Sequence, residues 1–445
     1  MKAPPKSPVK GSTNGVAKNS AAPRLAVTVG VLLAGEEDTL ALDLDELAQL
    51  LATLKIEVGG RVIQKRQKVT PKCFVGEGKV EEIKELAQSL KADLVIFDRP
   101  ISGPQVRNLE EMIGCEVLDR TGVILEIFAR HARTNQAKTQ VEIARLEYQL
   151  PRMTGAWTHL ERQRGGGVQR GMGEKQIEVD RRMARERISR LKRQLGSIQK
   201  DRQNQRKARQ SELKVALVGY TNSGKTSIMS AVTRAAIQGE DVLFATLDSN
   251  VRTLDPSTRP KVLLSDTVGF IRNLPHGLIE SFKSTLDEVL EADLLLHVVD
   301  LSHPNFKAQM QTTSDVLREI GAGDLPTLMV FNKLDQVSDP LLPKILKAAY
   351  RTSVFVSAQS DDDMLKLRQY VCKYFEENLV KATLEVPADD QGLLSVIYRS
   401  CLILGTDFSV ENKARFEVRA TPAVLAKLHA SVVSVVEGPF RGLKA

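Results

Sequence analysis

The chain has 445 residues, 42% of them hydrophobic and 27% charged, and its formal net charge at pH 7 is +8. This length allows three or more domains with cores of their own, and the lack of any apolar run of about 18 residues excludes a transmembrane helix. No signal-peptide core is recognisable at the N-terminus. Four scattered cysteines without a CxxC pair fit a reducing compartment better than a zinc or disulfide framework, so we expect a cytoplasmic protein.

Residues 1–24 have the composition of a disordered basic tail. They contain five Lys and Arg, four Pro and no acidic residue, among many Ser, Ala, Gly and Asn. Such a segment buries too little apolar surface to offset the entropy lost on ordering.

Residues 25–121 are predicted to form an N-terminal α/β domain. The segment 79–90 has apolar residues at helical spacing. Strand-like apolar runs recur at 25–33, 94–98 and 115–118. Alternation of strands and helices implies a parallel sheet. The Gly-Glu-Gly motif at 76–78 lacks the spacing of a phosphate-binding loop, so a turn entering the helix is favoured over a second nucleotide site.

Residues 122–210 are predicted to form a helical hairpin. One helical stretch covers 122–150, and a second runs from about Glu174 towards Gln210. The second stretch has an apolar seam with steps of three, four and three residues, namely Ile188, Leu191, Leu195 and Ile198. A Gly-rich tip joins the two helices.

The hairpin region is strongly basic. Between residues 151 and 214 there are 18 Lys and Arg against 7 Asp and Glu, which is the electrostatic footprint of a polyanion-binding surface. Arginines suit phosphates, and aromatic rings suit unstacked RNA bases. The candidate RNA-binding residues are Trp157, His159, Arg162, Arg164 and Arg170. The alternative is a flexible linker followed by a solvated, charged helix.

Residues 211–380 are predicted to form a separate α/β domain. The segment 219–226 reads Gly-Tyr-Thr-Asn-Ser-Gly-Lys-Thr, between an apolar run and helix-forming residues, which is the context of a phosphate-binding P-loop. Its glycines let backbone N–H groups face an anion. Lys225 is expected to reach the β- and γ-phosphates, and the hydroxyl of Thr226 to bind Mg²⁺.

Two further motifs follow at strand ends. Asp266-Thr-Val-Gly269 places a carboxylate near the Mg²⁺ water shell and lets the Gly269 N–H approach the γ-phosphate. Asn332-Lys-Leu-Asp335 selects guanine, because the Asp335 carboxylate accepts from N1–H and the 2-amino group, which adenine lacks. Ser357-Ala358 is placed to meet the guanine O6. This order of motifs is that of a GTPase, so residues 211–380 are predicted to form a Ras-like GTPase domain.

The loop around residue 246 supplies the remaining Mg²⁺ contact. Thr246 is the preferred ligand, with Thr253 and Thr258 as weaker candidates. The predicted catalytic residues are Lys225, Thr246 and Gly269. The predicted GTP-binding residues are Gly219, Tyr220, Thr221, Asn222, Ser223, Gly224, Lys225, Thr226, Phe244, Ala245, Thr246, Leu247, Asp248, Asp266, Thr267, Val268, Gly269, Asn332, Lys333, Leu334, Asp335, Ser357, Ala358 and Gln359.

Two residues bear on the rate of hydrolysis. Asn222 is a candidate for holding K⁺ beside the phosphates, as in several similar P-loop GTPases; the alternative is a side chain that caps the loop. Phe270 stands where many Ras-like GTPases place a water-orienting Gln, so slow basal hydrolysis is expected.

Residues 381–445 are predicted to form a small C-terminal α/β domain. The segments 392–398 and 421–428 look helical, the second with a proline in its first turn. Between them, residues 415–419 alternate like a strand.

A family resemblance is carried by the P-loop together with residues 76–82, 150–160, 173–176, 180–182, 244–248 and 266–270. In these motifs the chain resembles the HflX family of translation-associated GTPases. It implies the domain order above, Mg²⁺ on Thr226 and Thr246, and guanine on Asn332 and Asp335. It also implies binding to the large (50S) ribosomal subunit and splitting or rescue of stalled ribosomes.

The chain departs from the family pattern at three places. Residues 173–176 read Gly-Glu-Lys-Gln where the family more often has Gly-Glu-Thr-Gln, Ser249 replaces a proline, and the basic tail is an addition. We expect a monomeric, Mg²⁺-dependent GTP hydrolase that gates contact with ribosomal RNA. The alternatives are an RNA chaperone or helicase-like GTPase and, in another class, a nucleotide-gated scaffold with negligible hydrolysis.

Overall fold

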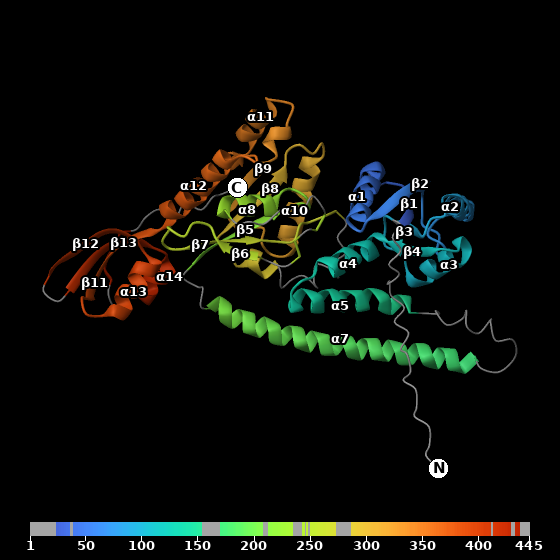
Figure 1. Cartoon of the computed structure of the whole chain (residues 1–445), viewed down its shortest axis with the longest axis horizontal. Coiled ribbons are helices and arrows are strands. Elements are labelled where there is room, and N and C mark those ends of the chain that lie inside the picture. Colours follow the sequence, from blue (N-terminus) through green and yellow to red (C-terminus); the bar gives the residue numbers. More distant parts are fainter. Residues whose placement is uncertain are drawn as a thin grey trace, which may run out of the picture.

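The computed structural model describes residues 24–35, 39–153, 170–207, 212–234, 243–244, 246–247, 250–272, 286–410, 413–428 and 432–436. Three sheets of four, six and four strands follow one another along the chain (Figure 1). This mixed α/β fold with a Ras-like domain confirms the predicted fold class. Among the described residues, no helix is long and apolar enough to cross a membrane.

The N-terminal sheet is parallel, with strand order β2-β1-β3-β4. Its elements are β1 (Arg24–Leu33), α1 (Leu40–Thr53), β2 (Ile56–Arg66), α2 (Glu77–Leu90), β3 (Leu94–Phe97), α3 (Gly103–Ile113) and β4 (Glu116–Asp119). The three predicted strands are present, and Gly76 caps α2 as expected. The edge strand β2 is an element that the sequence pattern does not predict.

The prediction of one long helix over 122–150 is wrong. The segment forms α4 (Arg120–His131) and α5 (Asn135–Gln149), followed by the short helix η1 (Leu150–Arg152). The chain is extended at Ala132, and the Thr134 hydroxyl accepts from the Ala137 N–H at 3.2 Å to start a new helix. Therefore α4 packs into the N-terminal core while α5 packs against the long helix α7 (Arg170–Lys207).

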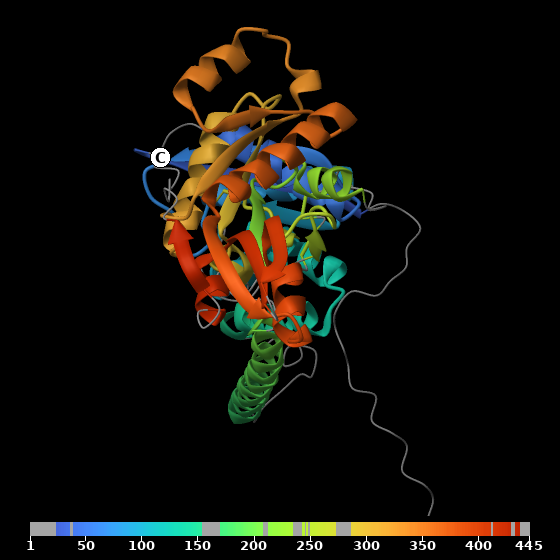
Figure 2. The same cartoon turned by 90° about the vertical axis from the view of Figure 1, so that its left-hand side faces the viewer.

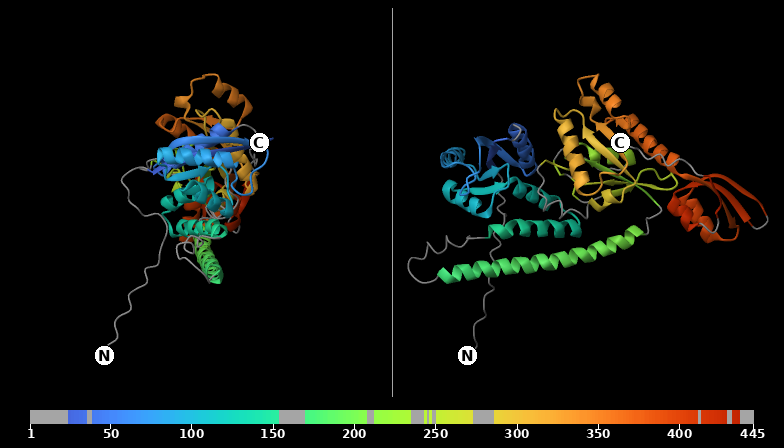
Figure 3. Two further views of the ribbon diagram at one scale, coloured as in Figure 1. Left: turned by 90° about the vertical axis from the view of Figure 1, so that its right-hand side faces the viewer. Right: turned by 180° about the vertical axis from the view of Figure 1, so that it is seen from behind.

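Helices α5 and α7 are in contact, with a buried leucine on α7 and two charged pairs between the helices. Leu191 of the predicted seam is buried. At the margins, Arg187 pairs with Glu142, and Lys192 lies 2.7 Å from Glu147. Helix α7 runs beneath the N-terminal and GTPase domains in Figures 1 and 3, and lies below the other elements in the end-on view of Figure 2. The predicted tip, residues 154–169, lies outside the described residues.

The GTPase sheet has the order β10-β9-β8-β5-β7-β6, parallel except for β6. Its elements are β5 (Leu213–Gly219), α8 (Lys225–Thr233), β6 (Asn250–Thr253), β7 (Val262–Asp266), β8 (Leu294–Asp300), α10 (Phe306–Glu319), β9 (Thr327–Asn332), η2 (Leu334–Gln336), α11 (Leu342–Ala349), β10 (Ser353–Phe355) and α12 (Asp361–Asn378). All five predicted strands are present, and the carboxyl ends of β5, β7, β9 and β10 lead into the predicted motifs.

The C-terminal sheet is antiparallel, with order β12-β13-β11-β14. Its elements are β11 (Val380–Pro387), α13 (Gln391–Ser400), β12 (Leu402–Val410), β13 (Lys413–Ala420), α14 (Pro422–Lys427) and β14 (Val432–Val436). Both predicted helices and the predicted strand are present. This domain lies at the opposite end of the molecule from the N-terminal sheet (Figure 3).

One apolar cluster spans two domains. Residues of α1, α4 and α5 pack with Leu243, Phe244 and Leu247 from one GTPase loop, and with Val268 and Ile271 from another. The rings of Phe128 and Phe244 meet edge-to-face, with centroids 4.8 Å apart. The loops that surround the phosphate end of the predicted nucleotide site thus rest on the N-terminal domain.

Candidate active site

The P-loop connects β5 to α8 through two glycines that no other residue could replace without strain. Gly219 and Gly224 have φ values of +152° and +91°. A Cβ at Gly219 would lie 2.2 Å from the Val298 carbonyl oxygen, and one at Gly224 would lie 2.2 Å from Asn332 Nδ2. The curled backbone leads directly into the N-terminus of α8, where an anion is favoured.

Lys225 is buried at the centre of this loop. Its side chain is 6% exposed, and its Nζ donates to the carbonyls of Gly219 at 3.1 Å and Tyr220 at 2.7 Å. Burial lowers the pKa of Lys225 to about 8, against an opposing influence from Asp266. A bound phosphate would place further negative charge beside this ammonium group and favour its protonated form.

Three oxygen-bearing side chains converge at the start of α8. Thr226 Oγ1 donates to Asp266 Oδ2 at 2.7 Å, and Thr246 Oγ1 lies 2.8 Å from Thr226 Oγ1 and 3.1 Å from Asp266 Oδ2. Asp266 is fully buried, burial raises its pKa, and its Oδ1 has no hydrogen-bond partner among the described residues. This oxygen-only set fits a hard divalent cation such as Mg²⁺.

Thr246 is the only one of the three threonine candidates that lies in this cluster. Thr253 belongs to β6, and the Thr258 hydroxyl donates to the Asp255 carbonyl at 2.9 Å. Ala245 and Asp248, which flank Thr246 in the predicted site, lie outside the described residues.

The loop after β7 is pressed against the P-loop. A Cβ at Gly269 would lie 2.8 Å from Thr221 Cα and 3.0 Å from Lys225 Nζ, so only glycine fits. Phe270 exchanges backbone hydrogen bonds with the P-loop, donating to Gly219 O at 3.1 Å and accepting from Thr221 N at 2.7 Å. Its ring is 3% exposed and packs into the core with Val218 and Leu286, so it does not face the phosphate side.

The predicted base-recognition loops are joined by Asn332. Its Nδ2 donates to Ser223 O at 2.8 Å, and its Oδ1 accepts from Ala358 N at 3.1 Å. The amide thus ties the P-loop to the loop at 357–359, a structural role that the motif alone does not predict. Lys333 has a left-handed backbone and pairs with Asp300 at 2.8 Å, while Asp335 is exposed in η2.

Asp363 is a residue of the site that the sequence motifs do not include. Its Oδ2 accepts from the Ser357 N–H at 3.0 Å and fixes the loop that is expected to meet the guanine O6. A signal is nevertheless present in the sequence, because Ser360 and Asp363 have the spacing of a helix-capping box, and the Ser360 hydroxyl accepts from Asp363 N at 3.3 Å.

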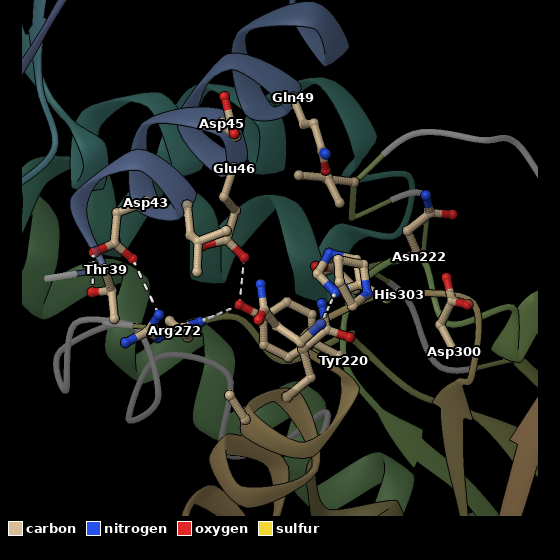
Figure 4. A pocket seen from close by; sticks show the side chains of 17 residues that line it. Thr39, Asp43, Asp45, Glu46, Gln49, Tyr220, Asn222, Arg272, Asp300 and His303 are labelled. Atoms are coloured by element: carbon tan, nitrogen blue, oxygen red, sulfur yellow. Dashed lines mark hydrogen bonds and ion pairs between the residues drawn. The ribbon is translucent and has the colours of Figure 1, made fainter. Parts of the chain in front are cut away.

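The predicted RNA-binding residues are not brought into this site. Trp157, His159, Arg162 and Arg164 lie outside the described residues, as does the side chain of Arg170. A feature that the sequence does not reveal is a cavity of about 490 Å³ between the P-loop, α1 and the start of α10 (Figure 4). Asn222 and Asp300 line it from the GTPase domain, and Glu46 and Gln49 from the N-terminal domain.

Three families match consecutive segments of the chain. Residues 41–129 match "GTP-binding GTPase N-terminal", residues 131–209 "GTP-binding GTPase Middle Region", and residues 214–333 "50S ribosome-binding GTPase". A crystal structure of a GTP-binding protein from Sulfolobus solfataricus with GDP is 25% identical, covers 78% of this chain and 99% of its own, and gives a TM-score of 0.42.

Two curated relatives are more similar in sequence. GTPase HflX of Gluconacetobacter diazotrophicus is 40% identical over 92% of this chain and 98% of that protein. GTPase HflX of Escherichia coli is 40% identical over 80% of this chain and 84% of that protein. This identity over most of both chains, together with a complete set of nucleotide-binding motifs on a Ras-like sheet, means that the chain belongs to the HflX family of GTPases and binds and hydrolyses GTP.

Proposed function

We propose that this GTPase associates with the large (50S) ribosomal subunit and splits or rescues stalled ribosomes, acting as a monomer in the cytoplasm. The observation that carries the proposal is the basic helix α7, which packs against α5. Helix α5 in turn belongs to the apolar cluster that supports the GTPase loops. Helix α7 exposes Arg185, Arg190 and Arg193, and exposed arginines are the usual partners of RNA phosphates. The family matched by residues 214–333 is itself described as 50S-binding.

For the nucleotide, we propose the following roles. The P-loop N–H groups and Lys225 bind the β- and γ-phosphates, and the N–H of Gly269 approaches the γ-phosphate. Thr226 and Thr246 hold Mg²⁺, with Asp266 binding its water shell; the ion when bound would neutralise charge on the phosphate oxygens. Asp335 accepts hydrogen bonds from the Watson–Crick edge of guanine, and Asn332 lies beside it in the same motif. The loop at residues 357–359 contacts the guanine O6.

We also propose that Asn222 places K⁺ beside the phosphates. Its backbone is left-handed, with φ of 61°, and the residue lines the cavity next to the P-loop. The amide oxygen is a suitable ligand for a hard monovalent cation. The alternative, a side chain that only caps the loop, predicts equal turnover in K⁺ and Na⁺.

The ribosome proposal is tested by sedimentation with purified 50S subunits, in GDP and in a non-hydrolysable GTP analogue, over a series of salt concentrations. Binding should be stronger with the analogue and should weaken with salt. Replacing Arg185, Arg190 and Arg193 by Gln should flatten the log–log salt dependence by about 0.7–0.9 for each phosphate that is no longer neutralised. Replacing Arg162, Arg164 and Arg170 of the predicted tip by Gln should also flatten the salt dependence.

A matched control removes three charges elsewhere. Lys344, Lys366 and Lys373 are exposed lysines of α11 and α12, and their replacement by Gln should leave the slope unchanged. An equal slope in all variants would contradict the proposal. Strand separation of duplex RNA without ribosome splitting would instead support the RNA chaperone or helicase-like alternative. We do not propose a scaffold without hydrolysis, because the family is one of GTPases.

A further inference from the structure

Thr221, the third residue of the P-loop, has a buried side chain whose hydroxyl group lacks a partner. The residue is 6% exposed, and its Oγ1 makes no hydrogen bond within the part of the chain that the structure describes. The backbone is held in place, because the Thr221 N–H donates to the Phe270 carbonyl at 2.7 Å. Most buried polar side-chain atoms in proteins are hydrogen-bonded, so an unpaired hydroxyl in a phosphate-binding loop indicates a missing ligand.

The Thr221 side chain lies beside the groups that are expected to meet the γ-phosphate. A Cβ placed on Gly269 would lie 2.8 Å from both Cα and Cγ2 of Thr221, and 3.0 Å from Lys225 Nζ. Thr221, Gly269 and Lys225 therefore meet at one point of the site. Thr221 also lines the cavity of about 490 Å³ together with Asn222, so there is space beside it for a water molecule.

A second hydroxyl group of the P-loop, that of Ser223, also lacks a partner among the described residues but lies elsewhere. Ser223 Oγ is 3.2 Å from the Cβ position of Gly219, and that position is 2.2 Å from the Val298 carbonyl oxygen in β8. Ser223 is thus near the sheet, and it does not line the cavity. Of these two hydroxyl groups, that of Thr221 is the one next to Gly269.

The position of Phe270 leaves one role in hydrolysis without a residue. Many Ras-like GTPases use a Gln there to orient the attacking water, but the Phe270 ring packs in the core and has no polar atom. We propose that Thr221 is a catalytic residue whose hydroxyl group takes this role. It accepts a hydrogen bond from the attacking water and donates one to an oxygen of the γ-phosphate.

The hydroxyl group of Thr221 orients the reactants and is not consumed. The water oxygen forms a bond to the γ-phosphorus while the bond from that phosphorus to the β–γ bridging oxygen breaks. GDP leaves with the bonding electron pair, and the proton lost by the water ends on the released phosphate. Thr221 gains and loses no proton overall, and it acts by fixing the direction of attack. This role rests on the proposed approach of the Gly269 N–H to the γ-phosphate, but not on binding to ribosomes.

The test is single-turnover GTP hydrolysis by the full-length chain without ribosomes, with Mg²⁺ and K⁺ present and all GTP bound. Thr221→Val replaces the hydroxyl by a methyl group of similar size, so the rate constant should fall roughly 10- to 100-fold, as expected for losing a hydrogen bond to a charged group. The unfolding temperature should stay the same or rise, because an unpaired buried hydroxyl is removed. Thr221→Ser keeps the hydroxyl and should retain most of the rate.

The chain offers a matched control in Thr313 of α10. This threonine is also fully buried, but its hydroxyl donates to the Gln309 carbonyl at 3.0 Å, so Thr313→Val should leave the hydrolysis rate unchanged. The proposal is overturned if Thr221→Val hydrolyses GTP at the wild-type rate, if Thr221→Ser is as slow as Thr221→Val, or if Thr313→Val slows hydrolysis equally. Lys225→Ala should weaken GTP binding, and normal binding by this variant would contradict the proposed phosphate site as well as the role of Thr221.

Discussion

The phosphate end and the base end of the nucleotide site are built in different ways. Thr246, Tyr220 and Arg272 belong to loops that pack on, or hydrogen-bond to, the N-terminal domain. Asn332 and Ser357, by contrast, are held by partners inside the GTPase domain. Changes in the N-terminal domain should therefore alter hydrolysis and leave base selection unchanged. Substitutions confined to one end of the site can test this difference.

The largest effect is expected at the base end. Asp335→Asn replaces the proposed acceptor of two guanine hydrogen bonds by an amide that can donate to the 2-oxo group of xanthine. The ratio of GTP to xanthosine triphosphate affinity should fall by ~10⁴ where the original geometry is good. Competition binding with a fluorescent GDP analogue measures this ratio. Equal GTP affinity in variant and wild type would show that Asp335 does not recognise guanine.

Acid should weaken the core beneath the phosphate end. His297 in β8 is buried, and burial together with the Lys225 charge lowers its pKa from 6.5 to about 4. The unfolded chain therefore binds a proton that the native state excludes, and this contribution to stability is lost as the pH falls from 6.5 towards 4, by up to about 3 kcal/mol.

Urea unfolding of wild type and His297→Leu over this pH range tests the assignment. Asp98 and Asp266 have raised pKa values, so their protonation makes the native state more stable as the pH falls, opposite to the effect of His297. The informative quantity is therefore the difference in unfolding free energy between wild type and His297→Leu at each pH. Parallel pH profiles would show that His297 does not titrate in this way.

Thr246→Ala tests the proposed Mg²⁺ site formed by Thr226, Thr246 and Asp266 at the phosphate end. Removing this hydroxyl should reduce 50S-stimulated turnover by about 10²-fold, a size seen when one transition-state contact is removed. Affinity for GDP should be retained, because the P-loop is unchanged. Thr253→Ala serves as the control, since Thr253 lies in β6 and should have little effect. Similar losses in both variants would point to a general disturbance of the loop.

A smaller effect is expected from the monovalent cation. Turnover should be several-fold higher in KCl than in NaCl at matched ionic strength, and Asn222→Gly should abolish the difference. Glycine is the suitable replacement because the residue is left-handed, with φ of 61°. Equal wild-type turnover in the two salts would leave Asn222 with a loop-capping role only.

The smallest effect is expected at Phe270. The ring packs in the core, so truncation to Ala would leave a cavity costing about 3–5 kcal/mol and would confuse stability with catalysis. Phe270→Leu keeps most of the volume and should leave basal turnover essentially unchanged, because the ring does not contact the phosphate side. A large loss of basal rate with a normal unfolding temperature would assign this residue a catalytic role.

The motifs are predictable because their chemistry is local. Gly219 and Gly224 are required by left-handed backbone at fixed positions, and Lys225 and Thr226 follow at fixed spacing. The parallel strands are continuous apolar runs that sequence patterns identify. Strand β2 escapes such patterns because, at the sheet edge, most of its residues are polar or only partly buried. The helix break at Ala132 escapes them because Ala and Arg there favour continuing a helix.

The amino-acid sequence by itself determined that this chain is a GTPase, because phosphate, metal and guanine contacts come from short segments with characteristic residues in a fixed order. Only the tertiary structure decided that Glu46 and Arg120 meet Tyr220 and Arg272. Glu46 and Tyr220 are 174 positions apart. Glu46 looks in the sequence like an ordinary polar residue, and Tyr220 is recognisable only as a member of the P-loop. Their pairing arises because the packing of the N-terminal domain on the GTPase domain buries these side chains together, and no local pattern records such a contact.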